Sequence, residues 1–477
     1  MCWALLLPKG VALSTDFFNR PENRRAFLVA IIFLFAKMIL MLNKIKKLIP
    51  RFLFDFYHWL LAYTAAFVYG HPSRQMVVIG VTGTGGKSTV VNLIGRILEE
   101  AGYKIGWTTT FNFKIAEREW INKTKMTMLG RFALQKLLKQ MVAAGCRYTI
   151  IETSSEGILQ FRHLGIDYDV VVFTNLSPEH LERHGSFENY RMAKGKLFDR
   201  LSSPHKIIDG KKIKKISVAN LDDSQADYFL RFPADEYWGF TTTNNIKQIT
   251  NNKTTNNQIK IIKAENILSD SDGSRFIIHN SRFIIHLLGE FNVANALAAI
   301  AVARSQGIGL EVCQRALAKI PLMAGRMEVV VKEPFKVVVD YAHTPDELEK
   351  VYQTFSGKNL ICVLGAAGGG RDKWKRPELG KIADQYGAEI IITNEDPYDE
   401  DPQKIIDEVA SRVKNHHLYK TLDRGQAIAK ALSLVKPGEV VIITGKGSEQ
   451  CIMGPNGQKI PWNDKQAVKD VMLKMKN

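Results

Sequence analysis

The sequence predicts an α/β protein: a phosphate-loop domain on a parallel sheet, then a Rossmann-like domain, all preceded by a hydrophobic, helical N-terminal segment. The first indication is GVTGTGGKST at residues 80–89, directly after a short apolar run. The second is the alternation of apolar runs with helical periodicity from residue 76 onward, which is typical of a parallel sheet. The third is a new series of apolar runs after Pro321. We expect domains at 1–72, 73–321 and 322–477.

The N-terminal segment contains two apolar stretches. The first, 26–42, includes Lys37 and is shorter than the roughly 20 residues that a simple membrane span needs. The second, 52–70, is rich in aromatic residues but carries Asp55 and His58. Basic residues flank the first stretch on both sides: Arg24, Arg25, Lys44, Lys46 and Lys47. Three interpretations stay open, namely one or two membrane spans, an interfacial helix with a basic flank, or a helix packed on the soluble body.

Residues 80–89 have the composition of a phosphate-binding loop, although an ordinary glycine-rich turn is the alternative. The usual spacing places a glycine five residues before the Gly-Lys pair, where this chain has Val81. The loop glycines are Gly83, Gly85 and Gly86. They allow backbone N–H groups to converge on an anion, while Lys87 can reach nucleotide phosphates and Ser88 can bind Mg²⁺. The helical periodicity that follows predicts a helix whose positive end faces the phosphates.

Three strands are expected in the central domain, at 76–80, 148–151 and 170–173. The second ends in Glu152, and a carboxylate at that edge of a parallel sheet is suited to binding a second Mg²⁺. A solvated glutamate at the end of a strand is the plainer interpretation. The Asn- and Thr-rich stretch 241–257 is expected to be a surface loop.

The stretch 170–198 contains three further candidates for chemistry. His180 follows the third strand and could complete a metal site. His184 is an equally plausible ligand, and either histidine could simply cap a helix. Lys194 lies on a predicted helix, where a lone lysine is usually a solvated side chain.

The C-terminal domain repeats the pattern of apolar runs with polar ends. Its strands are expected at 336–340, 360–364, 389–393 and 439–444. Asp340 ends the first and can accept ribose hydroxyls. Arg371 belongs to the basic, glycine-rich stretch 365–380, which is either an anion receptor or a solvated loop. Glu449 in GKGSE could bind a substrate ammonium.

Composition restricts the class of protein. The chain has 477 residues and a formal net charge of +17, which could favour nucleic acid, an anionic membrane or phosphorylated substrates. No zinc-finger spacing or RNA-binding aromatic motif is found, so we expect no nucleic-acid partner. The five cysteines are scattered and form no C-x-x-C motif, which argues against disulfides and structural zinc and favours a cytoplasmic location.

Taken in order, the motifs resemble those of the Mur ligase family, and within it the MurE type, which adds an amino acid to UDP-N-acetylmuramoyl-dipeptide. The resemblance covers roughly residues 77–465. The motifs are GVTGTGGKST, ETSS, TNLSPEHLERHG, YRMAKGKLF, LGEFNVANALAA, GRME, VDYAHTPD, GGGRDKWKRP, NEDPYDEDP and GKGSE. One such motif is weak evidence, but ten in the same order are specific.

The resemblance implies an ATP-dependent, amide-forming ligase that works through an acyl phosphate, as a cytoplasmic monomer in cell-wall biogenesis. It implies ATP and two Mg²⁺ as cofactors, with a carbamylated lysine at Lys194. The residues implied for catalysis are Lys87, Glu152, His180 and Lys194. Those implied for metal binding are Ser88, Glu152, His180 and Lys194. Those implied for the nucleotide are Gly83, Thr84, Gly85, Gly86, Lys87, Ser88, Thr89, Asn292, Asn295, Arg326 and Asp340. Those implied for the acceptor and the amino acid are Thr127, Thr153, Ser154, Arg162, Arg371, Asp396, Gly445 and Glu449.

Several positions depart from the family pattern. Gly85 stands where the family usually has asparagine, and Glu156 and Ser448 stand where the MurE type usually has histidine. Diaminopimelate-adding enzymes read Asp-Asn-Pro-Arg where this chain has Tyr398 at the end of Glu-Asp-Pro-Tyr. Without that arginine a second carboxylate lacks its bidentate partner, although Arg371 could compensate. The added amino acid therefore stays open.

The largest departure is at the front, where residues 1–75 do not resemble the UDP-binding domain of this type. The acceptor is therefore either a UDP-linked muramoyl peptide or a lipid-linked one at the membrane surface. Two other functions stay open: a ligase of the folylpolyglutamate or cyanophycin synthetase type, and a non-catalytic, membrane-attached nucleotide-binding protein. VDYAHTPD with GRDKWKRP argues against the first, and the complete catalytic set argues against the second.

Overall fold

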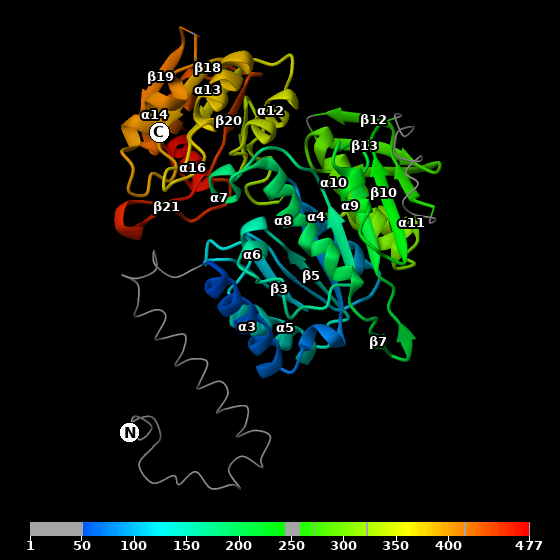
Figure 1. Cartoon of the computed structure of the whole chain (residues 1–477). Helices are drawn as coiled ribbons and strands as arrows, with labels where there is room; N and C mark the ends of the chain where they lie inside the picture. Colours follow the sequence, from blue (N-terminus) through cyan, green and yellow to red (C-terminus); the bar gives the residue numbers. More distant parts are fainter. Residues whose placement is uncertain (1–50, 244–257, 271, 321–322, 415, 477) are drawn as a thin grey trace, which may run out of the picture.

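A computed structural model describes residues 51–243, 258–270, 272–320, 323–414 and 416–476 (Figure 1). Two sheet-based units are present, as expected. The stretch 26–42 lies outside the described residues, and so do most of the Asn- and Thr-rich stretch and the predicted domain junction at 321–322. The domain limits therefore stay predictions.

The middle unit is built on a nine-stranded sheet with the order β11-β10-β9-β6-β1-β5-β2-β3-β4. Its strands are β1 (Val77–Thr82), β2 (Ile105–Thr108), β3 (Asn112–Ile115), β4 (Arg118–Ile121), β5 (Tyr148–Glu152), β6 (Val170–Phe173), β9 (Ile216–Asn220), β10 (Glu236–Thr241) and β11 (Lys260–Lys263). All neighbouring strands are parallel except β2–β3 and β3–β4, which form an antiparallel edge. The central strands are buried on both faces, which explains why they read as continuous apolar runs.

Helices cover both faces of this sheet. One face packs on α4 (Lys87–Glu100), α10 (Glu290–Ser305) and α11 (Leu310–Ala318). The other packs on α5 (Arg131–Ala143), α6 (Ser155–Leu159), α8 (Phe187–Phe198) and α9 (Ala226–Leu230). A small antiparallel sheet of β12 (Glu265–Asp270), β13 (Gly273–Ile278) and β14 (Ser281–Ile285) packs beside α11. The short elements of the unit are η1 (Pro72–Gln75), α7 (Leu181–His184), η2 (Asp199–Ser202), β7 (Ile207–Ile208) and β8 (Lys211–Lys212).

The C-terminal unit has a six-stranded sheet with the order β15-β16-β20-β17-β18-β19. Its strands are β15 (Glu328–Val331), β16 (Lys336–Val339), β17 (Leu360–Leu364), β18 (Gly387–Thr393), β19 (Leu418–Thr421) and β20 (Val440–Ile443). Only β15 is antiparallel. One face packs on α12 (Pro345–Gln353), α13 (Lys375–Tyr386) and α14 (Pro402–Ala410), and the other on α15 (Arg424–Leu434) and α16 (Asp464–Lys476). The hairpin β21 (Cys451–Met453) and β22 (Lys459–Pro461), with η4 (Pro455–Gly457) between its strands, follows β20.

The helix α3 (Arg51–Val68) precedes the middle sheet and packs against α5 (Figure 1). This arrangement agrees with a helix packed on the body for the stretch 52–70. Within the part of the chain that the structure describes, no helix is long and apolar enough to cross a membrane.

Candidate active site

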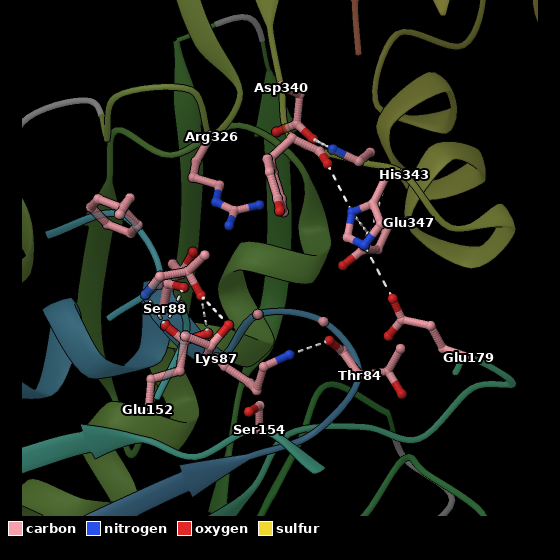
Figure 2. Close-up of a pocket in the computed structure, with 18 of the residues that line it drawn as sticks. Thr84, Lys87, Ser88, Glu152, Ser154, Glu179, Arg326, Asp340, His343 and Glu347 are labelled. Atoms are coloured by element: carbon pink, nitrogen blue, oxygen red, sulfur yellow. Dashed lines mark hydrogen bonds and ion pairs between the residues drawn. The ribbon is translucent and has the colours of Figure 1, made fainter. Parts of the chain in front are cut away.

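A cavity of about 1060 Å³ lies between the two units. The middle unit contributes the loop after β1 and the ends of β5 and β6, and the C-terminal unit contributes the ends of β16, β18 and β20. Both sheets therefore present their carboxyl edges to the same space, as expected for open α/β sheets. Figure 2 shows the part of the cavity around the phosphate loop.

The loop between β1 and α4 has the backbone of an anion receptor. Gly83 and Gly86 have φ values of 154° and 77°, in the region that favours glycine. A Cβ on Gly83 would meet Thr174 Oγ1 at 1.9 Å, and one on Gly86 would meet Asn295 Oδ1 at 2.3 Å. α4 begins at Lys87, so its positive end faces the cavity. Both glycines are therefore required by conformation and by close neighbours.

Ser88 and Glu152, which were predicted to bind separate Mg²⁺ ions, lie in direct contact. Ser88 Oγ donates a hydrogen bond of 2.6 Å to Glu152 Oε2 (Figure 2). Thr110 orients the same carboxylate through its backbone N–H at 2.7 Å and its hydroxyl at 2.9 Å. Lys87 Nζ folds back onto the carbonyl of Thr84 at 2.5 Å. A hydroxyl, a carboxylate and an ammonium thus meet beside the loop.

Lys194 lies behind the phosphate loop, outside the cavity wall. Its side chain is buried, donates 2.7 Å to the carbonyl of Gly83, and lies 4.4 Å from the centre of the Tyr190 ring. Burial, and then the positive charge of Lys87, hold the pKa of Lys194 well below its usual range. Burial and its contact with the Gly83 carbonyl distinguish this lysine from a solvated helical lysine.

His180 lies on the cavity wall but apart from Glu152. Its ring nitrogens lie 3.5 Å from Glu179 and 3.9 Å from Glu182. The residue has a φ of 56°, in the left-handed region, and it begins the short helix α7. The other candidate, His184, is buried and contacts Ser155 at 3.1 Å, so it has a partner within the fold.

The donors around Ser88 fit a magnesium ion that also takes phosphate oxygens. Hydroxyl and carboxylate oxygens are the ligands that Mg²⁺ prefers, usually with waters and substrate phosphates. Within the described residues, no group of three or more His, Cys, Asp or Glu side chains could hold a metal alone. Ser88 and Glu152 are the pair that could hold such an ion, while His180 and Lys194 do not contact them.

Ten of the eleven residues predicted for the nucleotide line the cavity, and Gly83 does not. Asn292 and Asn295 are buried on α10, and Asn295 donates 2.9 Å to Asn292. Arg326 lies 4.4 Å above the Tyr341 ring. The Asp340 carboxylate accepts hydrogen bonds of 2.7 Å from the backbone N–H groups of Met327 and Ala342. It therefore stabilises the turn after β16. Its predicted contact with ribose stays a prediction.

Three of the four residues predicted for the acceptor lie on the cavity wall: Thr127, Ser154 and Arg162. Thr153 does not, because its buried hydroxyl donates 3.2 Å to the carbonyl of Ile151. Arg162 hydrogen-bonds Gln160 at 2.5 Å and also the carbonyl of Met128.

The residues predicted for the amino acid, Arg371, Asp396, Gly445 and Glu449, all line the opposite wall. Two lysines already bind the acidic pair. Lys446 Nζ lies 2.7 Å from Asp396 and also contacts Glu449. Lys125, from the middle unit, lies 3.3 Å from Asp396 and 3.1 Å from Glu449. Burial would raise the pKa of Asp396, but Lys446 and then Lys125 outweigh it and lower this pKa. In this structure the pair therefore binds two lysine ammonium groups.

Sequence reasoning missed the residues that join the two walls. His343 Nε2 lies 3.1 Å from Glu179 Oε1 across the cavity (Figure 2). Asp372 accepts the backbone N–H groups of Leu181 and Glu182, at 3.1 and 3.0 Å. Glu179, His343 and Asp372 occur inside motifs quoted above, at polar positions after strands, and that was the available signal.

Comparison with known proteins agrees with these motifs. Residues 81–303 match the Mur ligase middle domain and residues 325–447 match the Mur ligase, glutamate ligase domain. The chain is 37% identical to the UDP-N-acetylmuramyl-tripeptide synthetase of Roseiflexus sp. (strain RS-1), over 85% of this chain and 80% of that protein. It is 34% identical to the UDP-N-acetylmuramoyl-L-alanyl-D-glutamate--2,6-diaminopimelate ligase of Halalkalibacterium halodurans, over 82% of this chain and 77% of that protein.

Solved structures show the same relationship. A structure of a UDP-N-acetylmuramoyl-L-alanyl-D-glutamate--2,6-diaminopimelate ligase is 28% identical and superposes with a TM-score of 0.55, covering 84% of this chain and 79% of the other. The folylpolyglutamate synthase of Mycobacterium tuberculosis superposes with a TM-score of 0.61 at 15% identity, covering 81% and 92%. The second likeness shows a shared fold alone.

Proposed function

Because the chain belongs to the Mur ligase family, we propose that it is an ATP-dependent ligase that joins an amino acid to a muramoyl-peptide precursor of peptidoglycan. The names of the two relatives support this substrate class over folate or cyanophycin. One observation carries the proposal: a single cavity has a phosphate loop on one wall and the ammonium receptor of Asp396 and Glu449 on the other.

The reaction uses these walls in two steps. A carboxylate is a poor electrophile, so the γ-phosphoryl group of ATP is transferred to it, which releases ADP and forms an acyl phosphate. The amine of the amino acid then attacks the carbonyl carbon and loses a proton to solvent, and phosphate leaves with the bonding electron pair to give an amide. Lys87 and the loop N–H groups stabilise the charge on the transferring group. Closure of the two units excludes water, which would hydrolyse the acyl phosphate.

Mg²⁺, when bound, supplies further neutralisation of phosphate charge. Ser88 and Glu152 would hold one such ion. The family resemblance implies a second, for which His180 and a modified Lys194 are the proposed residues.

We further propose that Lys194 carries a carbamate. A neutral amine adds to CO₂, forming a C–N bond and releasing a proton, and the lowered pKa of Lys194 supports a neutral amine. Labelling with ¹³C-bicarbonate should give a carbamate carbon signal by NMR. Lys194→Arg should lack this signal while the chain stays folded. An unlabelled wild type would exclude the modification.

The form of the acceptor is the least constrained part of the proposal. A cytoplasmic location, with a lipid-linked acceptor at the inner membrane face, fits the net charge of +17 and the apolar N-terminus. Purified enzyme should be compared on UDP-linked and lipid-linked muramoyl peptides by mass spectrometry. Equal turnover of the detergent-free soluble acceptor would exclude the lipid-linked version.

One screen tests the reaction itself. Phosphate release is measured with ATP, a muramoyl-dipeptide acceptor and each amino acid in turn, and the product is identified by its mass. We expect release only when acceptor and one amino acid are both present. Release that needs neither, or none with any amino acid, would contradict the proposal.

A further inference from the structure

The helix α3 presents an uncharged apolar surface to solvent. Four exposed residues in its first half, Phe52 (68% exposed), Leu53 (46%), Phe56 (59%) and Trp59 (41%), are here called the aromatic face, and Phe67 (41%) is exposed nearer its end. At 100° per residue these four positions fall within about 120° of the helix circumference. Large apolar side chains that share one exposed face are unusual on a soluble surface and mark an interaction site.

The opposite side of α3 is firmly packed. Ala62, Ala65 and Ala66 are buried, and α3 packs on α5. The carbonyl of Ala62 lies so close to Gly165 that a Cβ there would come within 2.8 Å. The helix cannot turn its aromatic face inward without breaking this packing.

The charge around the aromatic face selects its partner. Asp55 is the single acid in residues 43–68 of the sequence, and at 100° per residue it falls about 40° outside the edge of the face at Trp59. The stretch 43–51, which leads into α3, reads NKIKKLIPR and contains four cations and no acid. In the sequence, a basic stretch followed by exposed Phe, Leu and Trp is the composition of helices that lie in the plane of an anionic membrane surface.

The helix α3 itself lies near the acceptor side of the cavity. α5, the helix that holds α3, follows directly after Met126, Thr127 and Met128, which line the cavity. Burial, and then the charge of Arg131, lower the pKa of His58 to about 4, and Arg162 on the cavity wall adds to this shift. α3 is therefore near the end of the cavity that is predicted to hold the acceptor.

We propose that the aromatic face of α3 docks the enzyme flat on an anionic lipid bilayer. Because α3 lies near the acceptor side of the cavity, the docking brings that side close to the lipid surface. This second point rests on the proposed function, whereas the docking itself does not.

Vesicle binding by the full-length protein tests the docking. Vesicles of phosphatidylglycerol and phosphatidylcholine in equal parts are compared with pure phosphatidylcholine by co-sedimentation. We expect binding to the anionic vesicles only, weakened about tenfold or more in Phe56→Glu/Trp59→Glu, because each charge near the surface changes the binding energy by about 1 kcal/mol. The matched control, Leu268→Glu/Ile284→Glu, replaces two exposed apolar residues of the small sheet and should bind as the wild type does.

The outcomes separate the candidate occupants of the face. Unchanged binding by Phe56→Glu/Trp59→Glu would overturn the proposal, because residues 1–50 would then carry the binding. If the wild type forms a dimer without lipid and Phe56→Glu/Trp59→Glu dissociates that dimer, the docking proposal is overturned. The occupant of the aromatic face would then be a second copy of this chain. Turnover of a soluble acceptor is measured in parallel, so that loss of vesicle binding with normal turnover is distinguished from failure of the proposed function.

Discussion

The two walls of the cavity have opposite chemistry. The phosphate-loop wall offers backbone N–H groups and Lys87, with Lys194 buried behind it. The C-terminal wall offers Asp396 and Glu449, which already hold two lysine ammonium groups. The two walls therefore differ in charge: the first is suited to a triphosphate, and the second is suited to an amine.

The walls are joined by contacts that cross between the units. The contacts are His343 with Glu179, Lys125 with the acidic pair, and Asp372 with the first backbone N–H groups of α7. Each pairs a charged or polar group of one unit with a group of opposite character in the other. Closure of the two units therefore depends on side chains that lie between the phosphate loop and the acidic pair.

Removing the ammonium group of Lys87 from the phosphate-loop wall should have the largest effect on activity. Lys87→Ala is expected to lower kcat by roughly 10²–10³-fold, since the transferring phosphoryl group loses a charge-stabilising partner. Acceptor-dependent ADP release measures this. Lys104→Ala, which removes an exposed lysine before β2, is the control and should leave kcat unchanged. Comparable losses of kcat in both variants would mean that Lys87 has no specific role in the reaction.

Neutralising a carboxylate on the C-terminal wall should weaken binding of the amine and leave binding of the nucleotide unchanged. Glu449→Gln is expected to raise the KM for the amino acid by roughly 10–100-fold, because a charge-assisted hydrogen bond is worth about 1.5–3 kcal/mol. The dissociation constant of ATP should not change, which calorimetry can check. Glu378→Gln removes a carboxylate that pairs with Arg412 outside the cavity and serves as control. A shift in ATP affinity would show that the two walls are not chemically separate.

The contact between the walls should depend on pH. Burial would lower the pKa of His343, but Glu347 and Glu179 outweigh it and raise this pKa above 6.5. Its ionic contribution is therefore complete below pH 6.5 and is lost as pH rises through the raised value. We expect His343→Gln to cost about 1 kcal/mol of stability at pH 6 and less at pH 9. Thermal unfolding at both pH values measures the difference.

A surface pair provides the control for this last experiment. His205 lies 2.8 Å from Asp235, and both side chains are about one third exposed. His205→Gln should have a smaller effect on unfolding and none on kcat. If His343→Gln shows the same loss of stability at both pH values, the contact is not ionic.

The parts of the site that were predictable are those whose partners are close along the chain or at the ends of strands. Lys87 and Ser88 belong to one loop, and Glu152 ends a strand that pairs with the strand before that loop, so a parallel sheet brings them together. Thr153, predicted to bind substrate, does not line the cavity, and its hydroxyl donates to the carbonyl of Ile151. Lys125 was missed because its partners are 271 and 324 residues away.

The amino-acid sequence alone determined the alternation of strands and helices, the phosphate loop and the family, since these depend on local composition and on the order of motifs. The tertiary structure decided what depends on distance and burial: that Lys194 is a buried amine behind the loop, that Lys125 crosses to the opposite unit, and that α3 has one packed face and one bare aromatic face. Periodicity places residues on the faces of an element, but only packing decides which face finds a partner.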